Sequence, residues 1–197
     1  AQGGDRVIAI DKVQGTIRAA KTKSAGSLTA AAPVVSGMPD VVAVVGQDGA
    51  IHAASATSKS LVSLEANDKG WEEATNNSLK LTSGTDLAIT AVGDKPVVLE
   101  RSTGILHLPE GKSVNLDTSG LALQQPGPDA DSVLVASRNE LISVPLDGGK
   151  VTRTPSSKEK SAPEGVAAQP VRLGKCVYAA WSGSGQLVRS CSGLFSG

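Results

Sequence analysis

The chain has 197 residues, which is enough for one domain with a full hydrophobic core. Its 19 basic and 19 acidic residues balance without a long run of either sign, so neither nucleic acid nor an acidic membrane surface is expected as a partner. No apolar segment approaches the roughly 18 residues of a membrane span. No signal-peptide pattern opens the chain either, so any targeting segment or anchor is expected to lie outside this sequence.

The first half reads as short apolar runs separated by turns, with no helical periodicity of any length. Aromatic residues make up 2% of the chain, so the core must be built from aliphatic side chains. A loop carrying Trp71 is expected over 67–77, and 79–81 begins the next unit. The expected strands before it are 6–10, 16–20, 33–37, 41–45, 50–56 and 61–64.

The second half continues in the same way. A Ser-, Lys-, Glu- and Pro-rich segment at 156–165 is expected to be an exposed, flexible loop. Asp129 and Asp131 are expected in a solvated turn, because one Asp-x-Asp pair falls short of the 6–8 oxygens that calcium requires. The expected strands of this half are 87–92, 96–100, 105–108, 121–125, 132–137, 141–146 and 150–154.

The last stretch, 170–191, predicts a β-hairpin whose turn falls on Ser-Gly-Ser-Gly, where glycine supplies the positive φ of a tight turn. In this register Trp181 faces Gln186, and Cys176 faces Cys191. Directly opposed residues lie close enough for a disulfide after modest adjustment. We therefore expect a structural disulfide and an oxidising compartment. A pair of buried reduced thiols is the alternative.

The spacing of the apolar runs indicates the fold. Runs that begin at Val41, Leu87, Ser132 and Cys176 are separated by 46, 45 and 44 residues. Several short strands per unit at this period are typical of a β-propeller, whose blades are four-stranded sheets around a channel. A β-sandwich is the competing all-β fold, but it does not predict such even spacing.

We therefore predict one all-β, propeller-type domain over 1–197. Its expected units are 5–32, 33–66, 79–116, 121–154 and 167–191. These amount to about four and a half blades, whereas closed propellers typically have four to eight complete ones. The chain is accordingly expected to be a fragment of a larger protein with an incomplete ring.

Two segments, LQQPGPDADSVLVA and PVRLGKCVYAAWSGSGQLVRSC, resemble the propeller-like extracytoplasmic region of large actinobacterial surface proteins. Proteins of this family carry an N-terminal membrane anchor and tandem immunoglobulin-like or fibronectin type III repeats. The resemblance implies a cell-surface location and a binding or envelope-scaffold role. It carries over no functional positions except the cysteine pair.

The sequence contains few candidate catalytic or ligand-binding residues. The two histidines, His52 and His107, fall on strands of different units, so a shared metal site is not expected. The sequence has no Gly-x-Ser-x-Gly elbow, dinucleotide fingerprint or phosphate loop, so no cofactor is expected. The preferred hypothesis is a non-catalytic extracellular module that binds a protein or a glycan, or spaces other domains from the membrane.

Five residues are candidate ligand contacts: Trp71, Trp181, Asp48, Asp94 and Glu140. Trp71 is more simply explained as a loop residue that covers apolar surface, and Trp181 can as readily cap the core. The alternative function is a propeller enzyme acting on a polysaccharide or a small ester through the three carboxylates, which are expected on turns of different units. Carboxylates gathered within about 10 Å around one pocket would favour the enzyme. Scattered, exposed carboxylates would favour the binding module.

Overall fold

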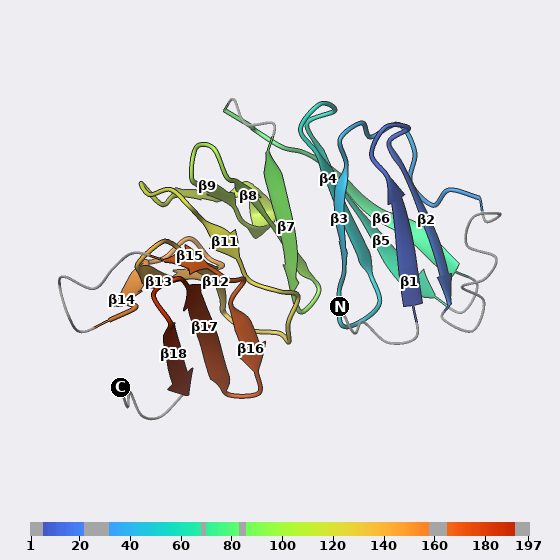
Figure 1. Ribbon diagram of the computed structural model, residues 1–197. Helices are drawn as coiled ribbons and strands as arrows, with labels where there is room; N and C mark the ends of the chain where they lie inside the picture. Colours follow the sequence, from blue (N-terminus) through green and yellow to red (C-terminus); the bar gives the residue numbers. More distant parts are fainter. Residues whose placement is uncertain (1–5, 22–31, 68–69, 83–85, 158–164, 192–197) are drawn as a thin grey trace.

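The computed structural model describes residues 6–21, 32–67, 70–82, 86–157 and 165–191. Antiparallel β-sheets follow one another along an arc in chain order, with β1 and β2 at one end and β18 at the other (Figure 1). The sheets fan out side by side and do not form two face-packed layers, so the fold is of β-propeller type. In the described part of the chain, no helix is long and apolar enough to cross a membrane.

The first sheet is a hairpin, and three four-stranded sheets follow in which consecutive strands pair. The first sheet contains β1 (Arg6–Asp11) and β2 (Thr16–Lys21). The second contains β3 (Val42–Val45), β4 (Ile51–Ser55), β5 (Ser60–Asn67) and β6 (Gly70–Ser78). The third contains β7 (Leu87–Val92), β8 (Lys95–Glu100), β9 (Ile105–His107) and β10 (Ser113–Asn115), with a short 3-10 turn, η2 (Pro109–Gly111), before β10. The fourth contains β11 (Ala122–Leu123), β12 (Ser132–Ala136), β13 (Glu140–Pro145) and β14 (Thr152–Pro155).

The fifth sheet confirms the predicted hairpin. β17 (Cys176–Ser182) pairs with β18 (Gln186–Cys191) in the expected register, with Cys176 opposite Cys191. On its other side β17 pairs with β15 (Val166–Ala167) and β16 (Val171–Leu173). The pairing shifts by one residue between these two segments, so they form one strand interrupted by a bulge.

The hydrophobic core is divided among the spaces between consecutive sheets. Ile17 and Ile51 pack between the first and second sheets. Leu99 and Ile142 are buried in the cluster between the third and fourth. Smaller clusters fill the other two spaces, with Trp181 in the last. The second, third and fourth sheets are covered on both faces by neighbours. Aliphatic side chains of modest size fill the spaces between sheets, each contributing about 1.5–3 kcal/mol on full burial.

The first strands of neighbouring sheets lie along the inside of the arc. β7 contacts β3 and β4 on one side and β11 on the other. The backbone N–H of Gly93 donates to the carbonyl of Gly127, and the N–H of Gly127 donates to the carbonyl of Ala91, each at 3.0 Å. These bonds join the third and fourth sheets by a parallel bridge.

The predicted period is only partly correct. The runs at Val41 and Leu87 are the first strands of their sheets, whereas those at Ser132 and Cys176 are second strands. A first strand of only two residues, β11, precedes β12 and lacks a strong apolar run of its own. The even spacing therefore joins strands that are not equivalent, and the turn before Glu140 is not equivalent to the turns that carry Asp48 and Asp94.

Two further expectations fail. The segment around Trp71, predicted as a loop, is the outermost strand β6. The predicted strand at 33–37 is reduced to a single bridge between Val35 and Ile17. Most of the loop predicted at 156–165 lies outside the described residues.

Candidate functional site

A large cleft lies between the second and third sheets and has a volume of about 920 Å³. One wall is formed by β5 and β6, and the other by the turn between β7 and β8 and by the segment around η2. Its volume lies in the upper part of the roughly 300–1,000 Å³ range of small-ligand sites. We call it the first cleft.

Two of the predicted carboxylates line the first cleft. Asp48 lies in the turn between β3 and β4, and Asp94 lies in the equivalent turn between β7 and β8. The Asp48 carboxylate accepts a hydrogen bond from the Ala50 N–H at 3.0 Å, which closes the turn. Gly49 in this turn has φ +84°, a conformation that glycine adopts at little cost. Both carboxylates therefore occupy turns at the same end of adjacent sheets.

His52 stands on β4 beside these turns and also lines the first cleft. The residue is 2% exposed, and its Nδ1 lies 2.8 Å from the Ser63 hydroxyl on β5. The other ring nitrogen, Nε2, is buried and has no hydrogen-bond partner. Burial lowers the pKa of His52, and the negative charges of Asp48 and Asp94 oppose this effect. The imidazole is therefore held neutral next to two carboxylates.

His107, on β9, lines the same cleft but is engaged by Glu100 on β8. The His107 Nε2 lies 2.7 Å from Glu100 Oε1, and the glutamate is completely buried. The Thr82 hydroxyl donates to the same carboxylate at 2.9 Å, and the Thr103 hydroxyl donates at 3.3 Å. A buried carboxylate needs such hydrogen-bond partners. The Glu100 carboxylate therefore has a structural role: it connects Thr82, which precedes the third sheet, to β8 and β9 of that sheet.

A second cleft of about 480 Å³ lies between the third and fourth sheets. It shares Lys95, Glu110 and Lys112 with the first cleft. Lys95 forms an ion pair with Asp129 at 3.0 Å. This hydrogen bond and charge raise the pKa of Lys95 and lower that of Asp129. Both side chains are largely exposed, so the ion pair contributes little to stability. It holds the Lys95 ammonium beside Asp129, at the border between the two clefts.

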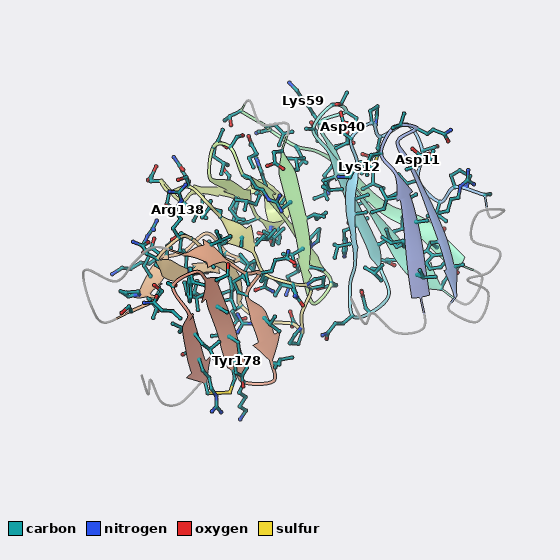
Figure 2. The ribbon with its side chains drawn as sticks, in the orientation of Figure 1. Asp11, Lys12, Asp40, Lys59, Arg138 and Tyr178 are labelled. Carbon is teal, nitrogen blue, oxygen red and sulfur yellow. A yellow bond between two sulfur atoms is a disulfide. The ribbon has the colours of Figure 1, made fainter. Side chains whose placement is uncertain are left out.

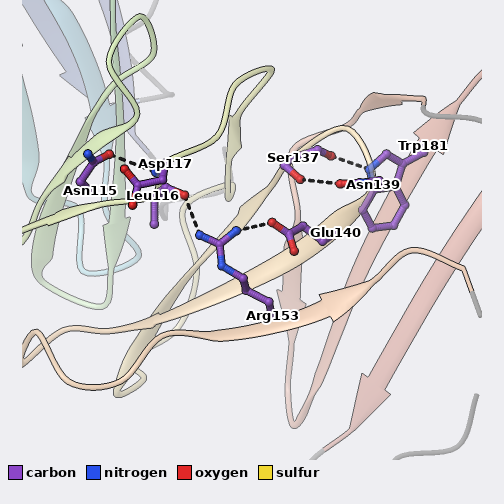
Figure 3. Close-up of polar contacts among 8 residues, drawn as sticks. All are labelled: Asn115, Leu116, Asp117, Ser137, Asn139, Glu140, Arg153 and Trp181. Atoms are coloured by element: carbon purple, nitrogen blue, oxygen red, sulfur yellow. Dashed lines mark hydrogen bonds and ion pairs between the residues drawn. The ribbon is translucent and has the colours of Figure 1, made fainter. Parts of the chain in front are cut away.

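Glu140, the third predicted carboxylate, is not at this site. It lies at the start of β13, after a turn between a second and a third strand. Antiparallel turns alternate between the two ends of a sheet, so this turn is at the opposite end from those of Asp48 and Asp94. Glu140 pairs with Arg153, whose guanidinium also donates to the Leu116 carbonyl (Figure 3). Its role is to join the fourth sheet to the third.

Trp181 is part of the core and does not offer a contact surface. Its side chain is 1% exposed, and its indole N–H donates to the Ser137 carbonyl at 2.6 Å across the space between the fourth and fifth sheets (Figure 3). Trp71 packs partly buried against the cluster between the first and second sheets. Its N–H donates to the Gly49 carbonyl at 3.2 Å. Neither indole lines the first cleft as described.

Cys176 and Cys191 form the expected disulfide, with a Cα–Cα distance of 3.9 Å. The bond is visible in yellow at the open end of the β17–β18 hairpin, below Tyr178 (Figure 2). Trp181 lies near the other end of β17, so the disulfide and the buried indole hold opposite ends of the same strand. The cysteine pair is therefore structural.

Sequence reasoning separated residues that the fold brings together. His52 and His107 were assigned to different units, yet both line the first cleft because it lies between those units. Asp129 and Asp131 are exposed, as expected for a solvated turn, and Asp129 in addition forms an ion pair with Lys95. The sequence feature that could have indicated a buried His52 was its position within a run of small residues on a predicted strand. Within the described residues, no group of three or more His, Cys, Asp or Glu is arranged to hold a metal ion.

The chain matches no family model, and no curated protein matches its sequence. Its fold is similar to virginiamycin B lyase from Staphylococcus aureus, with a TM-score of 0.50 and 12% identity over 97% of this chain and 71% of that one. It is also similar to the WD40 domain of SCAP from fission yeast, with a TM-score of 0.56 and 11% identity over 90% of this chain and 45% of that one.

A third similar structure is the extracellular domain of BT4673 from B. thetaiotaomicron, with a TM-score of 0.55 and 11% identity over 98% of this chain and 26% of that one. At these identities the likeness establishes the β-propeller fold. It does not transfer an activity, because propellers carry many unrelated functions.

Proposed function

We propose that this protein is a non-catalytic, extracytoplasmic binding or scaffold module of a bacterial surface protein. The observation that carries the proposal is the pair of clefts that open side by side and share Lys95, Glu110 and Lys112. Adjacent clefts with a common, charged border suit recognition of an extended partner, either a protein or a glycan.

The cellular location is proposed from the disulfide. Disulfides persist in oxidising compartments and are rare in the cytosol. The resemblance to anchored actinobacterial surface proteins supports the same location. The sequence of the full-length gene tests this part of the proposal: an upstream anchor and immunoglobulin-like or fibronectin type III repeats are expected. Cysteines that are reduced in the intact cell would contradict it.

Binding is tested with the oxidised protein and the cell envelope of its source organism. Sedimentation with envelope fragments should be saturable, and Glu110→Lys should weaken it because Glu110 lines both clefts. Glu72→Lys is the matched control, since Glu72 is exposed on β6 and lines neither cleft. Equal sedimentation of both variants and the wild type would contradict a role for this surface.

An enzyme acting on a polysaccharide or a small ester is the second candidate. The observation that favours it is the placement of Asp48 and Asp94 in one cleft. Glu140 lies elsewhere, and the Glu100 carboxylate is enclosed by its own partners. Turnover of envelope polysaccharide or ester substrates that is abolished by Asp94→Asn would establish this alternative and exclude the non-catalytic module.

A further inference from the structure

The first cleft contains a buried polar atom whose partner is missing. His52 Nε2 is buried without a hydrogen bond, although nearly all buried polar groups in folded proteins are paired. The residue is 2% exposed, and its Nδ1 is already used by the Ser63 hydroxyl. When the Nδ1–H donates to that hydroxyl, the free Nε2 of the neutral ring accepts. A ligand that donates an N–H would supply the hydrogen bond that His52 Nε2 lacks.

The charge around His52 is negative. Three lysines line the first cleft: Lys112 is paired with Glu110, Lys95 is paired with Asp129, and Lys80 is exposed just after β6. Asp48 and Asp94 form no ion pair within 4 Å among the described residues, although the charge of Asp94 also acts on Lys95. They lie close enough to act on the charge of the His52 ring. The cleft thus combines two carboxylates that form no ion pair with one ring nitrogen that has no hydrogen-bond partner.

Two other occupants fit less well. A metal ion would need further ligands, and the described residues offer no group of three or more His, Cys, Asp or Glu for one. A sugar ring commonly packs on an aromatic face, and the described lining includes no Trp, Tyr or Phe. Carboxylates with an N-acceptor instead match a guanidinium or an ammonium group, which has several N–H donors and no acceptor.

We propose that the first cleft binds an organic cation, namely the guanidinium or ammonium group of a basic side chain on a partner protein. The cation lies between the carboxylates of Asp48 and Asp94 and donates an N–H to His52. This inference rests on the proposed binding function and specifies its chemistry: the partner presents Arg or Lys at this cleft. A free polyamine offers the same chemistry from another source.

The test uses the intact oxidised protein and follows the His52 imidazole signal by NMR. Nα-acetyl-arginine methylamide represents the side chain of a partner, and spermidine represents a free polyamine. N-acetylglucosamine and magnesium chloride represent the occupants argued against. Saturable shifts of the His52 signal with the arginine derivative are expected. Tighter binding of the arginine derivative supports a basic side chain of a partner protein as the ligand. Tighter binding of spermidine would retain the cationic ligand but identify a free polyamine as its source.

Asp94→Asn is the informative variant, because asparagine is well suited to the same tight turn and should preserve folding. It is expected to weaken binding of the arginine derivative about tenfold or more, as for loss of a charge-assisted hydrogen bond. Glu72→Gln removes an equal charge outside the cleft and should leave affinity unchanged. Unchanged affinity in Asp94→Asn, or equal binding of the neutral sugar or magnesium, would overturn the inference.

The result is separable from that of the envelope assay. Envelope binding without any response to cationic probes would retain the binding function and refute the cationic ligand. A saturable response to the arginine derivative without envelope binding would retain the chemistry of the cleft and refute the proposed partner. The two measurements therefore fail independently.

Discussion

The disulfide between Cys176 and Cys191 should be the dominant stabiliser of the fifth sheet, and Cys191→Ser removes it. The two residues are separated by 15 positions, for which chain-entropy models predict about 3 kcal/mol. In a domain of 150–250 residues, each kcal/mol changes the melting temperature by roughly 2–4 °C. If the sheet unfolds with the rest of the protein, Cys191→Ser should therefore lower melting by about 6–12 °C.

The position of the disulfide also predicts where the loss is felt first. Trp181 anchors its end of β17 in the core, but at the other end β18 is held by pairing with β17 and by the disulfide. The alternating residues Leu187 and Arg189 are exposed, so β18 has little buried surface of its own. Loss of about 3 kcal/mol restricted to β18 would accelerate its amide exchange by roughly 100-fold.

Differential scanning calorimetry and amide hydrogen exchange of oxidised and reduced wild type measure both effects. The Cys176→Ser/Cys191→Ser double variant is the control, since a reductant should change neither its melting nor its exchange. The reasoning is refuted if the oxidised and reduced wild-type proteins melt at the same temperature and their β18 amides exchange equally fast.

Three further predictions concern single sites. Trp181→Phe should destabilise the protein by about 1–3 kcal/mol in urea unfolding, because the buried Ser137 carbonyl loses its donor; no change would contradict the bond. Since the pKa of His52 is lowered from 6.5 in the folded state, its contribution to stability should be complete above pH 6.5. It is lost as pH falls through the folded pKa, because the unfolded state binds the proton first; a His52→Gln variant should show a smaller loss of melting temperature on acidification. Gly15→Ala should cost clearly more than Gly37→Ala in the same unfolding assay, since both have positive φ but only at Gly15 would a Cβ meet backbone, at 2.4 Å; equal costs would refute this packing.

The parts of the fold that could be predicted are those whose pattern is local. The register of β17 and β18 follows from a glycine turn, which places Cys176 opposite Cys191 whatever the rest of the chain does. Apolar runs such as β7 and β12 are recognisable because neighbouring sheets cover both of their faces. The propeller fold was therefore accessible from the sequence.

The outermost strands were harder to identify because they are only partly covered. β6 is rich in polar residues, most of its described side chains are exposed, and it lacks the alternation of a half-buried strand. The short strand β10 was missed for the same reason, with Val114 as its single apolar residue. Strand identity here is imposed by pairing with the preceding strand and not by burial.

The candidate site depended on contacts between sheets, which spacing along the chain does not reveal. Treating the run at Ser132 as equivalent to that at Leu87 placed Glu140 on the wrong end of its sheet. The exposure of Trp181 was equally undetermined, because it depends on a carbonyl from the fourth sheet. The joint position of His52 and Asp94 likewise exists only where two units meet.

The separate cores between successive sheets determine how damage would spread through this molecule. Each core joins two neighbouring sheets. Unfolding of one sheet therefore directly destabilises the adjacent sheet, and more distant sheets are affected only after it. A destabilising mutation in the fifth sheet should expose Trp181 while Ile17 and Ile51 remain packed between the first and second sheets. Unfolding from one edge would then proceed in steps, and an intact remainder could still present the surface around Asp48.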